Sequence, residues 1–186
     1  MKQVAYYLFD TSLGSCGIAW SEGGNACTSP AVTLLQLPEA TTEMTESRIA
    51  QNSGARKSSA PPPQIADVIK KVCKHLQGEV QDFRDIAVDL DDAGPFARQV
   101  YEAARKISTG QTRTYGELAR TLGRPCAARA VGQALGRNPI GLIIPCHRVL
   151  AAGGKPGGFS AHGGPATKAR MLAIEGVTLR PPLTMK

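Results

Sequence analysis

The chain has 186 residues, of which 42% are hydrophobic and 20% charged, and its formal net charge is +7. This length accommodates one ordinary domain or two small ones with a globular core. No apolar run is long enough to span a bilayer, and the first residues lack the long apolar core of a signal peptide, which argues against a membrane or secreted class. The five cysteines are odd in number and form no CxxC pair, so we expect a reducing, cytoplasmic location, at the nucleoid if the source is prokaryotic.

The two halves of the chain differ in charge. Residues 1–93 carry 8 Lys+Arg and 12 Asp+Glu, a net charge of −4, whereas residues 94–186 carry 14 and 3, a net charge of +11. The turn-forming stretch 91–95 lies between them and predicts two domains, 1–93 and 94–186. A small basic half is typical of a module that binds a polyanion, with a solvated basic surface as the alternative.

The first half reads as a small sheet with helices. Apolar stretches separated by turn formers predict an antiparallel meander, with turns at residues 10–14 and 22–25. The expected strands are Val4–Phe9, Cys16–Trp20, Ala31–Leu37 and Ile86–Leu90.

Two helices are expected between the third and fourth strands. Thr45–Ala50 predicts a short helix, residues 51–63 a polar loop, and Ile65–Leu76 an amphipathic helix with Cys73 on its buried face. On this pattern His75 lies on the exposed side.

From Phe96 the pattern changes to helix. Residues 96–107 form an amphipathic stripe, and Thr114 with Glu117 forms a capping-box pattern at the start of a helix over residues 115–122. Gly123-Arg124-Pro125 ends it, and Pro125 opens the next helix, Cys126–Leu135. Two short helices joined by such a turn predict a helix-turn-helix.

The second of these helices is unusual for a DNA reader. Small residues surround a single Arg129, whereas recognition of base edges in the major groove usually takes several long polar side chains. Entry of Arg129 into the minor groove or a base stack fits better, and an ordinary phosphate contact is the alternative.

The next stretch contains the candidate nucleophile and its neighbours. The apolar run Ile140–Ile144 predicts a buried strand stopped by Pro145, after which Cys146, His147 and Arg148 are consecutive. Neighbouring cations lower the pKa of a thiol, so Cys146 is a candidate nucleophile, although buried unreactive cysteines are common. Neighbouring side chains on an extended segment diverge, so a direct contact between the Cys146 and His147 side chains is not the default geometry.

The last helix, Pro165–Glu175, carries an acid in its final turn. Glu175 is at the wrong end for the helix dipole, which invites a compensating contact, and a hydrogen bond to His147 would supply one. The glycine-rich residues 153–164 have no phosphate-loop pattern, and His162 there is expected to face solvent. Asn138, in an Asn-Pro turn, can orient a neighbouring side chain.

These residues resemble a known family. Pro145-Cys146-His147-Arg148-Val149 is similar to the signature of the O(6)-alkylguanine-DNA alkyltransferases, and the resemblance runs from about Phe96 to Gly176. Further blocks occur in family order and spacing, namely Thr114–Ala119, Ala127–Gly132, Arg137–Pro139 and Gly158–Ser160. The fold that the resemblance implies is α+β, with an N-terminal antiparallel sheet of the ribonuclease-H-like kind and a C-terminal winged helix-turn-helix.

The resemblance also implies a role for each matched residue. Cys146 takes the alkyl group in a single turnover, His147 is the base through a bridging water, Glu175 holds His147, and Asn138 orders the turn. Tyr115 helps rotate the phosphate and donates to the departing base. Arg129 fills the space of a guanine flipped out of duplex DNA. The implied DNA contacts also include Thr114, Ala127, Ala128 and Ala130, and the implied pocket residues are Phe159, Ser160, Val149 and Pro145.

The implied partner is double-stranded DNA with O(6)-alkylguanine, bound through the minor groove by a monomer, with cooperativity on DNA left open. No cofactor and no metal are expected, since Cys16, Cys27, Cys73 and His75 do not match a zinc ligand set. Two other classes are a non-catalytic winged-helix DNA-binding protein and a cysteine hydrolase. The first leaves Cys146, His147 and Glu175 unused, and the second leaves Arg129 and the basic half unused.

Overall fold

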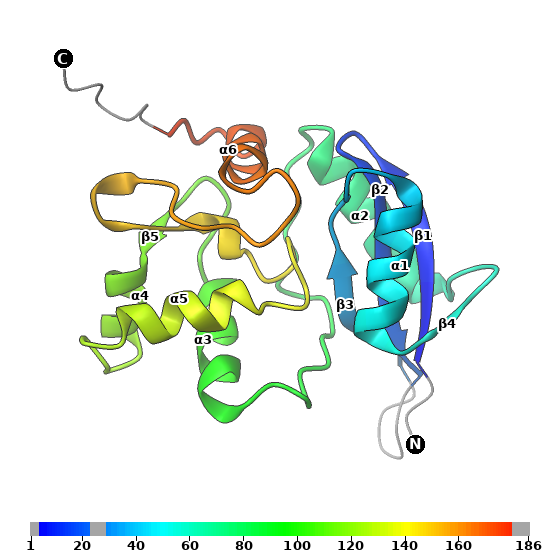
Figure 1. Cartoon of the computed structure of the whole chain (residues 1–186), viewed down its shortest axis with the longest axis horizontal. Coiled ribbons are helices and arrows are strands. Elements are labelled where there is room, and N and C mark those ends of the chain that lie inside the picture. Colours follow the sequence, from blue (N-terminus) through cyan, green and yellow to red (C-terminus); the bar gives the residue numbers. More distant parts are fainter. Residues whose placement is uncertain (1–3, 23–28, 180–186) are drawn as a thin grey trace. The chain divides into compact units, whose positions relative to one another are not determined.

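The computed structural model describes residues 4–22 and 29–179, and its chain forms two compact units (Figure 1). The first unit comprises the chain up to Ala93 together with Pro139–Ile143. The second comprises Gly94–Asn138 and the chain from Ile144 onward. The assignment of residues 1–93 and 94–186 as two domains stays a prediction.

The first unit is built on a four-stranded sheet of order β3-β2-β1-β4. β1 (Val4–Thr11) pairs antiparallel with β2 (Gly14–Ser21), which pairs antiparallel with β3 (Ala31–Gln36), so the predicted meander is confirmed. Gly14 closes the first hairpin with φ 126°, a conformation open to glycine. The turn expected at residues 22–25 lies largely outside the described residues.

Helices cover both faces of this sheet. Figure 1 shows α1 (Thr42–Ser53) in front of the sheet and α2 (Pro63–Leu76) behind it. Because side chains alternate along a strand, β2 needs both covers, and it is buried from Cys16 to Ser21. On the α1 side, Ile49 packs into a core cluster with Tyr6, Ala19 and Leu34.

Two expectations for the loop and the fourth strand of the first unit are wrong. The segment 51–63 is not all loop, because α1 continues to Ser53 and β4 (Arg56–Lys57) then pairs in parallel with β1. Ile86–Leu90 forms no strand and contributes an isolated parallel bridge between Val88 and Val32. At β4, pairing with the distant strand β1 overrode the local pattern, whereas Ile86–Leu90 has the alternating pattern of a strand but forms this isolated bridge to β3 and no ladder.

His75 is buried rather than exposed. The chain after α2 folds back over it, the Gln81 N–H donates to His75 Nδ1 over 3.1 Å, and the Phe83 ring lies 5.1 Å from the His75 ring. Cys73 is half-buried, and its thiol donates to the Asp10 carbonyl oxygen over 3.5 Å. The helical period of α2 shows which face of the helix is apolar, but it cannot predict that a later segment of the chain covers His75.

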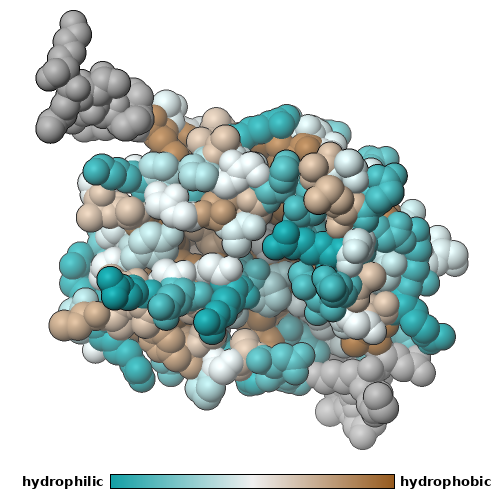
Figure 2. Space-filling model, in the orientation of Figure 1, coloured by the Kyte–Doolittle hydropathy of each residue, from teal (hydrophilic) through white to brown (hydrophobic). Residues whose placement is uncertain are grey.

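The second unit is mainly helical and contains the predicted helix-turn-helix. α3 (Pro95–Arg105) precedes α4 (Tyr115–Thr121) and α5 (Ala128–Gly136). The capping box forms as predicted, with the Thr114 side chain accepting from the Glu117 N–H and Glu117 accepting from the Thr114 N–H. α5 starts at Ala128, so Pro125 does not open it. In the orientation of Figure 2, hydrophilic residues form a row over α4 and α5.

A short parallel ribbon and a last helix complete this unit. β5 (Arg113–Thr114) pairs with β6 (Val149–Leu150), and α6 (Pro165–Ile174) follows two 3-10 turns, η1 (Cys146–Arg148) and η2 (Ala152–Gly154). With the mixed sheet of the first unit, this confirms the α+β class. Within residues 4–22 and 29–179, no helix is long and apolar enough to cross a membrane.

The run Ile140–Ile144 is not a strand, contrary to the sequence-based prediction. It forms a buried turn in which Leu142 has φ 69°, and Ile140 forms an isolated bridge with Leu35. Residues 139–143 pack with the first unit, where the Leu35 N–H donates to the Pro139 carbonyl oxygen over 3.0 Å. The run is apolar because it is buried, although it forms no strand ladder and is too short and irregular to be a strand.

Gly17 should be required for the packing of α1 on β2. A Cβ added there would lie 2.6 Å from Ile49 Cδ1, and Ile49 is fully buried, so Gly17→Ala should lower the free energy of unfolding by about 1–3 kcal/mol. The measurement is urea unfolding followed by circular dichroism. Gly136→Ala is the matched control, because a Cβ at Gly136 meets nothing within 4 Å. Equal stability of the two variants would contradict this packing argument.

Candidate active site

Cys146 lies at the start of the 3-10 turn η1, directly after Pro145. The Cys146 N–H donates to the Ile144 carbonyl oxygen over 2.8 Å, and the Arg148 N–H donates to the Pro145 carbonyl oxygen over 3.0 Å. Asn138 Nδ2 donates to the same Ile144 carbonyl over 2.8 Å, so Asn138 braces this turn from the end of α5. The segment is therefore curved rather than extended, and the geometric reason given above against a direct contact between Cys146 and His147 does not hold.

Glu175 holds two consecutive side chains of this turn. His147 Nε2 lies 3.0 Å from Glu175 Oε1, which is the contact expected from the position of Glu175 at the end of α6. Arg148 donates from Nε to Glu175 Oε2 over 2.9 Å and from Nη2 to Oε1 over 2.7 Å. All three side chains are buried. A bidentate guanidinium–carboxylate pair fixes both position and orientation of the acid that His147 contacts.

Arg148 extends this arrangement to the exit of α3, a role that the sequence did not reveal. Its Nη1 donates to the Ile107 carbonyl oxygen over 2.6 Å, and its Nη2 donates to Thr109 Oγ1 over 3.0 Å. A buried arginine beside a candidate nucleophile reads first as an activator of the thiol. Here its bonding goes to Glu175 and to the chain after α3. Its signal in the sequence was the excess of basic over acidic residues around a buried strand-like run.

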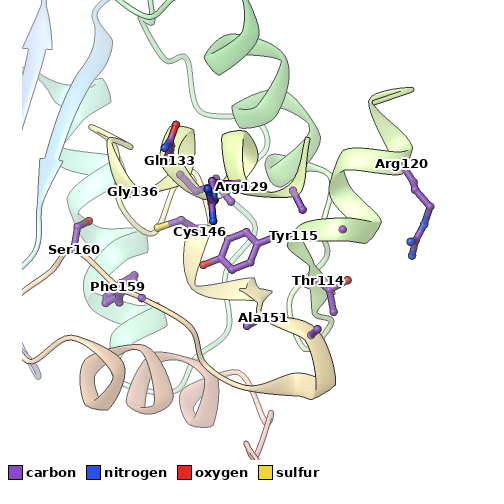
Figure 3. A pocket seen from close by; sticks show the side chains of 16 residues that line it. Thr114, Tyr115, Arg120, Arg129, Gln133, Gly136, Cys146, Ala151, Phe159 and Ser160 are labelled. Atoms are coloured by element: carbon purple, nitrogen blue, oxygen red, sulfur yellow. The ribbon is translucent and has the colours of Figure 1, made fainter. Parts of the chain in front are cut away.

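A pocket of about 910 Å³ opens beside Cys146 within the second unit. Tyr115 lies at the centre of Figure 3, with Cys146 on one side and the segment carrying Phe159 and Ser160 on another, whereas Arg120 lines the pocket apart from these residues. The lining comes from α4, α5, η1 and the loop after β6: Thr114, Tyr115, Gly116, Arg120, Ala128, Arg129, Gly132, Gln133, Leu135, Gly136, Cys146, Ala151, Ala152, Gly158, Phe159 and Ser160.

Half of the residues implied by the resemblance meet at this pocket. Cys146, Tyr115, Arg129, Phe159 and Ser160 line it, as do Thr114 and Ala128. The remaining residues do not line it: Ala127, Ala130, Asn138, Pro145, His147, Val149 and Glu175. Four of these are buried and support the site without lining the pocket: Pro145, His147, Val149 and Glu175. The roles of all these residues stay predictions.

Burial makes Cys146 a weaker acid than the sequence suggested. Its side chain is 9% exposed, and this burial raises the pKa of Cys146 above its usual value. A hydrogen bond from the Asn138 side chain and the positive charge of Lys168 act in the opposite direction without reversing the shift. The two candidate activators that follow Cys146 in the sequence, His147 and Arg148, direct their side chains to Glu175.

Tyr115 and Lys168 complete the surroundings of the thiol. Burial, with a smaller contribution from the charge of Cys146, raises the pKa of Tyr115, so it remains a protonated donor. Lys168, on α6, is fully buried, and its Nζ lies 5.8 Å from the centroid of the Tyr115 ring. Sequence reasoning missed Lys168, because a lysine on a short helix is normally exposed.

Glu175→Gln should be strongly destabilising. It leaves the buried Arg148 guanidinium without a charged partner, and breaking a buried pair in this way costs about 3–5 kcal/mol. Urea unfolding at neutral pH measures the change. Glu102→Gln removes the same charge from an exposed position of α3 and should change stability by less than about 0.5 kcal/mol. A small effect at Glu175 would show that the pair is dispensable for folding.

Comparison with known proteins agrees with this geometry. The family model described as 6-O-methylguanine DNA methyltransferase, DNA binding domain, matches residues 95–177. A methylated-DNA–protein-cysteine methyltransferase of Mycolicibacterium paratuberculosis is 34% identical over 172 residues, which are 92% of each chain.

Solved structures give the same result over the whole chain. The O6-methylguanine methyltransferase of Mycobacterium tuberculosis superposes with a TM-score of 0.73 at 32% identity over 98% of each chain. The OGT of the same organism in complex with DNA gives 0.71 at 32% identity over 92% of each chain. This chain belongs to the methylated-DNA–protein-cysteine methyltransferase family.

Proposed function

We propose that this protein repairs DNA by moving the alkyl group of O(6)-alkylguanine, flipped out of the duplex, irreversibly onto its own Cys146. The observation that carries this function is that Cys146 lines a pocket whose other walls are the two helices of a helix-turn-helix. A nucleophile in a pocket beside a DNA-binding motif can reach a base only if the base leaves the stack. The related OGT bound to DNA supports DNA as the partner.

The charge and shape of the second unit suit a DNA backbone. Residues 94–186 carry a net charge of +11, and exposed arginines lie along the helix-turn-helix at positions 120, 124, 129 and 137. Ala128 and Gly132 on α5 are small and line the pocket, which lets the helix approach the minor groove closely. Arg129 is the exposed cation among them and takes the space of the extruded guanine.

The transfer is an in-line displacement at the alkyl carbon. The Cys146 thiolate forms the S–C bond, the bond from carbon to guanine O6 breaks, and its electron pair leaves with guanine, which then takes up a proton. Negative charge develops on the purine, so the Ser160 and Tyr115 hydroxyls stabilise the transition state as donors. The product is a thioether with no facile reverse step, and no cofactor enters the balance.

The contact between His147 Nε2 and Glu175 supports Nδ1 as the proton acceptor on His147. When the neutral imidazole donates its Nε2–H to Glu175, the basic lone pair lies on Nδ1. His147 Nδ1 therefore receives the Cys146 proton, directly or through a water, and Glu175 stabilises the imidazolium that forms. Because burial raises the pKa of Cys146, this proton must be removed for the attack to occur at neutral pH.

A non-catalytic winged-helix DNA-binding protein is the alternative function. It accounts for the basic helix-turn-helix but gives no role to the thiol in the pocket or to the His147–Glu175 contact. It is not favoured by the family to which the chain belongs.

The test of the proposed function is a single-turnover incubation with an oligonucleotide containing O(6)-methylguanine, followed by peptide mass spectrometry. One added methyl group on the Cys146 peptide, with stoichiometric loss of the lesion, is the expected outcome. Cys126 is an exposed thiol and should stay unmodified. An intact lesion with unmodified Cys146, in a protein that still binds the DNA, would leave the non-catalytic alternative standing.

Arg129→Ala should separate base extrusion from chemistry. Unstacking a base costs a few kcal/mol, so losing the residue that fills the gap should slow repair of duplex DNA roughly 10- to 100-fold. Reaction with the free modified base should remain within about twofold, since no extrusion is needed. Arg120→Ala is the control with the same charge change, because Arg120 also lines the pocket but lies apart from Cys146 (Figure 3). Equal losses on duplex and free base would remove the assigned role.

A further inference from the structure

Lys168 occupies a position that is costly for a cation. It lies within α6, its side chain is fully buried, and its Nζ donates to the Val149 carbonyl oxygen over 2.6 Å. Val149 follows η1 directly, so this bond ties α6 to the turn that carries Cys146. A buried ammonium is normally paired with an acid. Across residues 4–22 and 29–179, no carboxylate forms an ion pair with Lys168.

The ionisable group that acts on Lys168 is Cys146. Burial lowers the pKa of Lys168 to about 8, and the charge of Cys146 opposes that shift. In return, the charge of Lys168 opposes the rise of the thiol pKa that burial causes. At neutral pH Lys168 thus keeps most of its charge, and the thiolate of Cys146 is the anion that can compensate it.

The other polar groups around Cys146 supply no negative charge that could compensate Lys168. Tyr101 on α3 and Tyr115 on α4 both have a raised pKa, from burial first and the Cys146 charge second, and are neutral at physiological pH. Asn138 is a neutral donor, and Glu175 is held by His147 Nε2 and by two nitrogens of Arg148, so the imidazolium formed on His147 faces Glu175. On α6 itself, Arg170 is exposed.

We propose that Lys168 is a positioning residue for alkyl transfer, whose buried ammonium favours the thiolate of Cys146 while its hydrogen bond to Val149 holds the reactive turn against α6. This inference rests on the proposed function, in which Cys146 is the acceptor. When the Cys146 proton leaves, the negative sulfur is balanced by Lys168. When the S–C bond forms, the sulfur becomes neutral and no longer compensates the positive charge of Lys168. The ammonium therefore favours the nucleophile and not the alkylated product.

The test reads the thiol itself and uses no DNA, so it stands whether or not the repair reaction occurs. Lys168→Met keeps the apolar stem and removes the charge. The rate of iodoacetamide modification of the Cys146 peptide is followed by mass spectrometry between about pH 6 and 10. Below the Lys168 pKa of about 8 the variant should react roughly tenfold more slowly than the unaltered protein. At higher pH the two should converge, because Lys168 of the unaltered protein is then neutral, as the methionine of the variant is at every pH.

Two controls belong to this experiment. Arg170→Met removes one charge from an exposed position of the same helix and should leave the Cys146 profile unchanged. The exposed thiol of Cys126 reports general reactivity in every sample. A pH profile of Cys146 that is the same in Lys168→Met and the unaltered protein would overturn the proposal. So would a loss that is uniform at all pH values, which indicates a structural role alone.

A second measurement keeps the proposal testable if Lys168→Met fails to fold. Nuclear magnetic resonance of the Lys168 side chain gives its titration midpoint in the unaltered protein and in Cys146→Ser, where no thiolate can form. The midpoint should fall in Cys146→Ser, since the anion that favours the charged lysine is gone. An unchanged midpoint would show that the two groups are not coupled.

Discussion

The carboxylate of Glu175 is the constraint on which the second unit depends. It receives two bonds from Arg148 and contacts His147, and Arg148 in turn binds the chain after α3 at Ile107 and Thr109. One buried acid thus joins the end of α6, the turn η1 and the exit of α3. Its position in the last turn is unfavourable for the helix dipole, and two buried cationic or basic partners supply the compensation. The site is therefore oriented by an ion cluster that lies behind the pocket and does not line it.

Features governed by neighbouring residues could be predicted from the sequence. The hairpin of β1 and β2, the capping box of Thr114 and Glu117, and the helix-turn-helix all follow from local spacing and are present. The contact between Glu175 and His147 was also predictable, because an acid that violates a local rule requires a partner from elsewhere. That prediction used the sign and position of one charge, and no knowledge of the fold.

Features governed by distant segments could not be predicted in this way. The run 140–144 is apolar because residues 139–143 pack with the first unit, and its backbone includes a positive φ at Leu142 that no strand would have. His75 is covered by the later segment around Gln81 and Phe83. Lys168 is spaced like an ordinary surface lysine of α6, and only the tertiary fold shows that it lies near the thiol. In each case the deciding partner is remote in sequence.

The scarcity of acids after residue 93 explains how the site and the DNA-binding surface coexist. That half contains three carboxylates: Glu102 is exposed on α3, Glu117 caps α4, and Glu175 binds Arg148. Glu117 interacts electrostatically with Arg120, but among the described residues none of the three forms an ion pair with Arg129, so the charge of Arg129 remains available to phosphates. None pairs with Lys168 either. The nearby side chain that can compensate the charge of Lys168 is therefore Cys146, which becomes an anion only during the reaction. A buried cation without a permanent acidic partner favours a thiolate more than a cation that is already paired with a carboxylate.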